Sequence, residues 1–185
     1  MYAPHTVTVF NSREDGLPVA TILRGVFLDV SKGANVKASG MENADAATLY
    51  IPFTVEAVHA ETGEKQTFVG PKEYGSVIEK EHYWTLRTSG TGGAADCFFA
   101  RGEIHESGKY QAINSAFDDV FRVSTVDTKD FGTPDMQHWE VGGRYCSSSA
   151  QMSTGTLMSG LQAMTAQSTR LLCRWRRTRA HLFPP

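Results

Sequence analysis

Apolar and polar residues alternate along much of this 185-residue chain with the period of two that is typical of half-buried β-strands. The longest such run is 41–58, MENADAATLYIPFTVEAV, in which Asn43 and Asp45 supply turn residues and the residues after them predict one strand with an apolar face that includes Leu49, Ile51 and Phe53. Pro52 cannot donate to a strand ladder, so we expect the strand to bend, bulge or run along an edge at that residue.

Further alternating runs surround this strand and predict about seven or eight short strands in all. Their ranges are 5–11, 20–31, 66–69, 83–87, 96–103, 118–127 and 137–141. The inward-facing residues are expected to be Val7, Val9, Val26, Leu28, Leu49, Ile51, Phe53, Phe99 and Val123. Short strands separated by turns at regular spacing are typical of a barrel or sandwich. The predicted fold class is therefore all-β, a mainly antiparallel small β-barrel or sandwich, with one or two short helical turns after Pro71 and around 110–117.

Two segments interrupt the regular pattern. Arg24 breaks the apolar face of its run beside Gly25, which favours a β-bulge that turns the side chain outward over a buried ion pair. The segment 32–45, KGANVKASGMENAD, is rich in Gly, Asn and other small residues and is longer than an ordinary hairpin loop. Loops of this length are usually functional or disordered.

Charge divides the chain in two. Residues 1–143 carry 12 Lys and Arg against 20 Asp and Glu, a net charge of −8, whereas 144–185 carry six Arg and no acid, a net charge of +6. An abrupt change of composition marks a domain boundary. We therefore expect a β-barrel domain over 1–143 and a basic tail over 144–185 that is disordered or forms a weak amphipathic helix over about 156–176. The tail is either a functional arm or the product of a frame shift or read-through.

No catalytic or metal-binding pattern stands out in the sequence. Cys97, Cys146 and Cys173 are odd in number and lack CxxC spacing, and the histidines form no HExxH motif. Asp118 and Asp119 are adjacent in a predicted strand and would point to opposite faces, which argues against a carboxylate dyad. No signal peptide and no apolar run of roughly 18–20 residues is present. We expect a non-enzymatic protein that needs no cofactor or metal and does not enter a membrane.

Several short sequence blocks, taken in order, resemble a known family. The blocks are HTVTVFN, TILRGVFLD, ADAATLYIPF, VGPKEY, YWTLR, FFARGE and HWEVGG, within about residues 4–143. They are similar to small structural proteins of tailed bacteriophages and prophages, the head-completion or stopper class of head-to-tail connector proteins. The resemblance implies a compact barrel that assembles as a homo-oligomeric ring beneath the portal. Its implied partners are portal or adaptor proteins, tail proteins and packaged double-stranded DNA in the channel.

In the stopper class, the long segment between the second and third strands projects into the channel, and the matching segment here is 32–45. The resemblance implies that Lys32 and Lys37 face DNA or neighbouring subunits and that Gly33 and Gly40 act as hinges. The alternative is an ordinary surface loop with solvated lysines.

The expected function is that of a virion protein at the head–tail interface, a head-closure or connector ring subunit that is present in the host cytoplasm during assembly. Two alternatives remain open at this point. One is a tail-completion or minor tail protein of the same particle. The other is a small barrel that binds single-stranded nucleic acid, which would require aromatic and basic residues interleaved on one face.

Overall fold

The computed structural model describes residues 3–13, 16–37, 40–43, 45–88 and 97–145, so most of the predicted tail, from residue 146 on, lies outside the described residues. The strands are β1 His5–Asn11, β2 Val19–Ser31, β3 Ala34–Lys37, β4 Gly40–Asn43, β5 Ala46–Pro52, β6 Glu56–His59, β7 Thr67–Phe68, β8 Tyr83–Trp84, β9 Cys97–Arg101, β10 Val120–Lys129 and β11 His138–Arg144. Two α-helices, α1 Pro71–Ser76 and α2 Tyr110–Ala116, and a 3₁₀ turn, Lys80–His82, complete the described elements.

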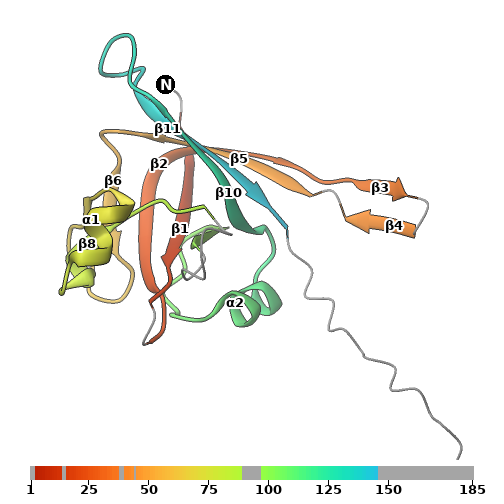
Figure 1. The fold of residues 1–185 in the computed structure, drawn as a ribbon, viewed down its shortest axis with the longest axis horizontal. Coiled ribbons are helices and arrows are strands. Elements are labelled where there is room, and N and C mark those ends of the chain that lie inside the picture. The colour runs from red at the N-terminus through yellow and green to blue at the C-terminus, as the bar shows by residue number, and fades with distance from the viewer. Residues whose placement is uncertain (1–2, 14–15, 38–39, 44, 89–96, 146–185) are drawn as a thin grey trace, which may run out of the picture. The chain divides into compact units, whose positions relative to one another are not determined.

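Six strands close into an antiparallel barrel (Figure 1). Their order around the barrel is β1–β9–β10–β11–β5–β2, and β2 pairs with β1 to complete the circle. Strand β6 pairs with a different part of β2, from Thr21 to Arg24. A closed barrel leaves no sheet edge along the closed part of its wall. The prediction of a mainly antiparallel β-barrel is confirmed.

The barrel interior holds the larger of two apolar cores. Eight of the nine residues expected to face inward are buried in it, and Phe53 is half-buried. The second core lies on the outer face of β1, β2 and β9, where Phe10 and Phe98 stack with ring centroids 4.5 Å apart. Helix α2 covers this face with Tyr110 and Ile113, which lie three residues apart on one side of the helix.

The prediction of a single strand after the turn at Asn43 and Asp45, running to residue 58, is wrong. This stretch contains two strands, β5 and β6, because β5 ends at Pro52 and the N–H of Val55 donates to the carbonyl of Pro52 in a turn, at 3.0 Å. After the turn, the chain no longer pairs with β11, and β6 pairs with β2 instead. The alternation of apolar and polar residues continues through the turn, so the pattern alone does not show the break.

A β-bulge at Gly25 turns Arg24 out of the barrel, as predicted. In the β1–β2 ladder, His5 pairs with Val26 and Thr6 pairs with Arg24, so Gly25 is left without an opposite residue. Its φ of 79° is one that side chains disfavour. The Arg24 guanidinium forms an ion pair with Glu103, whose hydrogen bond and charge raise the pKa of the arginine.

The bulge leads to a stability prediction. We expect Gly25→Ala to lower the free energy of unfolding by about 1–2 kcal/mol, because alanine at a positive φ is strained although no atom lies near its Cβ. Gly33→Ala is the matched control, since Gly33 also has open space around its Cβ but no positive φ. Equal urea-unfolding midpoints for the two variants would contradict this assignment of the bulge.

Candidate functional site

The segment 32–45, expected to be a long loop, contains a β-hairpin. Strands β2 and β5 pair as far as Ser31 and Ala46, and beyond them β3 pairs with β4 from Ala34 and Asn43 to Lys37 and Gly40. In Figure 1 this hairpin projects away from the barrel. We call residues 34–43, which contain β3 and β4, the arm. The expectation of one long loop over 32–45 is corrected, because β3 and β4 within it form a two-stranded ladder.

The four predicted site residues fall into two pairs. Lys37 and Gly40 lie opposite each other in the arm ladder. Lys32 and Gly33 lie at the root, between β2 and β3. The Gly33 N–H donates to Asp45 Oδ1 at 2.9 Å, which bridges the two sides of the root. Gly33 has no positive φ and no atom near its Cβ, so the structure does not require glycine there.

Lys32 forms an ion pair at the root of the arm. Its Nζ lies 2.7 Å from Oδ1 of Asp119, whose side chain is 13% exposed. Arg101 approaches the other carboxylate oxygen at 3.6 Å. The hydrogen bond and negative charge of Asp119 raise the pKa of Lys32, with a smaller contribution from Asp118. The Lys32 side chain is thus held at the root by Asp119, although it stays 61% exposed.

Asp119 is the residue that the sequence analysis missed. It precedes β10 and has a φ of 52°, a region that Asp and Asn tolerate better than most side chains do. Residues Lys32, Asp45, Asp118 and Asp119 line a polar pocket of about 220 Å³ at the root of the arm. Because Asp119 is far from Lys32 in sequence, no local pattern could pair them, and the adjacent aspartates were considered only as a catalytic pair.

A double-mutant cycle tests the root ion pair. We expect Lys32→Ala and Asp119→Asn each to lower the melting temperature, because each breaks the same contact, and we expect the double variant to lose less than the sum of the two. Asparagine keeps the tolerance for positive φ at position 119, so the backbone term is held constant. Strictly additive losses in thermal melts would show that the two side chains do not interact.

A strap of chain closes one end of the barrel. The run 83–87, predicted as a strand, pairs only at Tyr83 and Trp84 in β8, and Thr85 to Thr88 cross the barrel end instead. Asn11, buried at the end of β1, holds the strap: its Nδ2 donates to the Thr85 carbonyl at 2.7 Å, and its Oδ1 accepts from the Thr85 N–H at 3.1 Å. A side chain thus takes the place of a neighbouring strand.

Aromatic side chains gather beside the strap. The ring centroid of Trp139 lies 4.3 Å from those of Phe53 and Phe68 and 5.9 Å from that of Trp84. Nearby, burial raises the pKa of the Tyr74 hydroxyl in α1 to about 12. The aromatic cluster and the strap together form the walls of a cavity.

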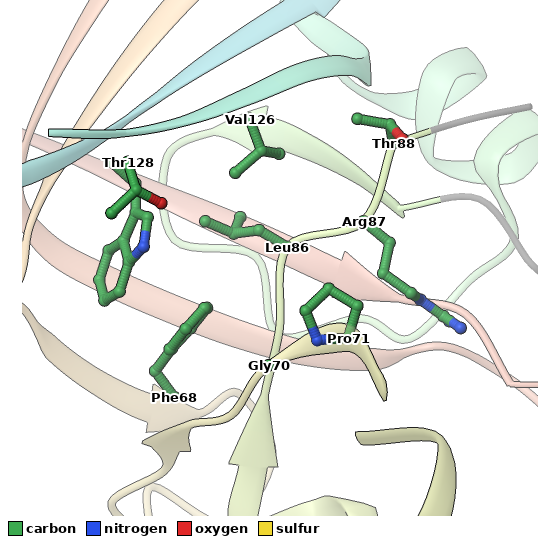
Figure 2. A pocket seen from close by; sticks show the side chains of 9 residues that line it. Phe68, Gly70, Pro71, Leu86, Arg87, Thr88, Val126 and Thr128 are labelled. Carbon is green, nitrogen blue, oxygen red and sulfur yellow. The ribbon is translucent and has the colours of Figure 1, made fainter. Parts of the chain in front are cut away.

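This cavity, which we call the apolar pocket, has a volume of about 510 Å³. Its lining residues are Phe68, Gly70, Pro71, Leu86, Arg87, Thr88, Val126, Thr128 and Trp139. Figure 2 shows the side chains of Phe68, Leu86 and Val126 turned toward the same space, with Arg87 leading away from it. The guanidinium of Arg87 donates to the Ser12 carbonyl at 3.0 Å. The volume falls in the range of pockets that enclose small molecules or side chains of a partner.

Other kinds of site are not found in the part of the chain that the structure describes. These residues hold no group of three or more His, Cys, Asp or Glu side chains placed to bind a metal ion. Within the same ranges, no helix has the length and apolar character needed to cross a membrane.

Comparison with protein-family models matches residues 2–144 to a family described as "Family of unknown function (DUF6751)". The match covers well over half of the chain. The chain belongs to this family. Comparisons with curated proteins and with solved structures gave no match. The DUF6751 match includes the barrel strands, the arm, the three aspartates of the root pocket and every residue that lines the apolar pocket.

Proposed function

We propose that this member of the DUF6751 family is a non-enzymatic structural protein of a tailed phage or prophage particle. In this proposal it is a head-closure or head–tail connector subunit that forms a ring, joins the portal to the tail and retains packaged DNA. Its partners are copies of itself, portal or adaptor proteins, tail proteins and the DNA in the channel.

The observation that carries the proposal is the arm. A small closed barrel extends one pair of its strands, β2 and β5, into a hairpin that leaves the barrel wall. The arm occupies the segment in which the resemblance to stopper proteins implies a channel loop. The order of the sequence blocks and the confirmed barrel add support, because both agree with that class of protein.

The root contacts supply a mechanical reason for this use of the hairpin. Lys32 and Asp119 join one side of the root to the start of β10, and the Asp45 side chain bridges to Gly33 on the other side. A hairpin fixed at its base keeps its direction when neighbours or DNA press against it. Since Lys32 is held at the root by Asp119 and Lys37 lies in β3, Lys37 is the lysine of the arm through which it would meet phosphate groups.

Mass spectrometry of purified particles tests this proposal. Particles made by the phage or prophage that encodes the chain should contain it in a fixed number of copies, far fewer than those of the major capsid protein. Immuno-gold labelling should place it at the vertex between head and tail. A chain that is made during assembly but absent from finished particles would refute the proposal, whereas a position further down the tail would favour the tail-completion or minor tail protein.

A further inference from the structure

The loop between β10 and β11 carries exposed apolar side chains at its end. Phe131 is 66% exposed and Met136 is 56% exposed. We call residues 130–137 the tip loop. In Figure 1 it projects beyond the barrel strands. Large apolar side chains gathered on a projecting loop are typical of a contact with another molecule.

Hydrogen bonds hold the tip loop in one shape. The Met136 N–H donates to the Thr133 carbonyl at 2.8 Å, and the Gln137 side-chain amide donates to the Asp130 carbonyl at 3.1 Å. Gly132, with a φ of 83°, lets the chain turn next to Met136. A loop that is already ordered loses little conformational entropy when it binds, so it is suited to docking.

The tip loop and the apolar pocket are complementary in charge and chemistry. The tip loop contains Asp130 and Asp135 and no basic residue. Among the described residues that line the pocket, Arg87 is the one charged side chain. An acidic loop with an aromatic end therefore matches a pocket that has aromatic walls and one positive charge beside it, the Arg87 guanidinium, which donates to the Ser12 carbonyl.

The two features cannot meet within one molecule. Thr128 and Trp139, which line the pocket, pair with each other in the β10–β11 ladder, and the ladder continues to Lys129 and His138 before the tip loop begins. The hairpin therefore directs its own tip loop away from its own pocket. A tip loop that enters an apolar pocket must come from another copy of the chain.

We propose that copies of this chain associate by inserting the tip loop of one copy, with Phe131 foremost, into the apolar pocket of the next. The contact is heterologous, because tip loop and pocket are different surfaces, and contacts of this type build rings when the rotation between copies closes. The inference rests on the proposed function in one respect only: that function makes the resulting ring a head–tail connector. The pairing of tip loop and pocket is argued from the chain itself.

The surface area that the inserted side chain buries sets the expected strength of this contact. One aromatic side chain buries roughly 150–250 Å², well below the roughly 800 Å² per partner of a standard stable interface. A single contact should therefore be weak and depend on concentration, and a closed ring should be more stable because every copy makes two contacts.

Native mass spectrometry and sedimentation of the full-length chain test the proposal with variants on each side of the contact. Phe131→Ser removes the inserted side chain, and Thr128→Trp fills the pocket from an exposed position. Each should weaken self-association about 10–100-fold, the effect expected from losing one buried aromatic side chain. Ile78→Ser is the matched control, since Ile78 is 95% exposed and lies outside both surfaces; it should associate like the wild type. Thermal melts should show that all three variants remain folded.

Mixing the two defective variants gives the sharpest result. The Phe131→Ser chain keeps its pocket and the Thr128→Trp chain keeps its tip loop, so a mixture should form a one-to-one heterodimer that neither variant forms with itself. A wild-type chain that stays monomeric at high concentration, association that ignores both substitutions, or association that Ile78→Ser abolishes would each overturn the contact. Mass spectrometry of particles tests the proposed function separately. If the contact forms but the chain is absent from particles, the function alone is refuted. If the chain is incorporated normally but Phe131→Ser associates like the wild type, the contact alone is refuted.

Discussion

Replacing Asn11 with alanine should destabilise the barrel by about 2–4 kcal/mol, because two buried backbone groups lose their hydrogen bonds at once. The N–H and the carbonyl of Thr85 both bond to the Asn11 side chain, which is fully buried, and its Nδ2 also donates to Cys97 Sγ at 3.1 Å. Without Asn11, the strap has no strand to pair with at this point. Urea unfolding of the full-length chain measures the loss.

Thr85→Val is the control at the same contact. Its hydroxyl is buried and has no hydrogen-bond partner among the described residues, so its removal should change the free energy of unfolding by less than about 1 kcal/mol or raise it. Asn11 binds the backbone of Thr85 and not its side chain, so the two variants separate these two contributions. Similar losses for both variants would show that packing at the strap, and not the Asn11 hydrogen bonds, holds the barrel end closed.

The barrel could be predicted from the sequence because the alternation that indicates each strand lies within that strand. Val7 and Val9 alternate with Thr6 and Thr8, Leu49 follows Thr48, and a closed barrel needs an inward face on every strand. The bulge beside Arg24 could also be predicted, since a charged residue next to glycine on an apolar face has few other solutions.

The breaks between strands and the long-range contacts could not be predicted in this way. The turn after Pro52 preserves the alternation, so one run concealed β5 and β6. The strap pairs with the side chain of Asn11 instead of with a strand, and strand patterns carry no sign of such a partner. The second core depends on α2 folding back over the outer face of the barrel, which no periodicity in β1 or β9 reveals.

The sequence singled out segment 32–45 but predicted a loop where the structure has a β-hairpin. Segment 32–45 does leave the barrel, yet it does so as a paired hairpin, and Lys32 is bound to Asp119. The apolar pocket was not expected at all, since its walls come from β7, the strap, β10 and β11. Residues so far apart in sequence come together only through the closure of the barrel.

Removing the arm should leave the barrel folded and abolish the retention of DNA that we propose for the arm. Deletion of 33–40 would remove β3 and leave β4 without its partner, so the arm is better removed as a unit, from Ala34 to Asn43. The remaining four residues, from Lys32 to Asp45, then connect the paired Ser31 and Ala46, a length that hairpin loops commonly have. The melting temperature of the variant should therefore stay close to that of the wild type.

The fraction of DNA-filled heads tests the central claim most directly. The phage or prophage that encodes the chain is made to carry the wild-type gene, the arm deletion or the Lys37→Glu variant. Filled and empty heads are then counted in purified particles by electron microscopy. The account predicts mostly empty heads with the arm deletion and a smaller loss with Lys37→Glu, because the reversed charge repels phosphate. Equal numbers of filled heads with the wild type and with a folded, incorporated arm deletion would contradict the claim that the arm retains DNA.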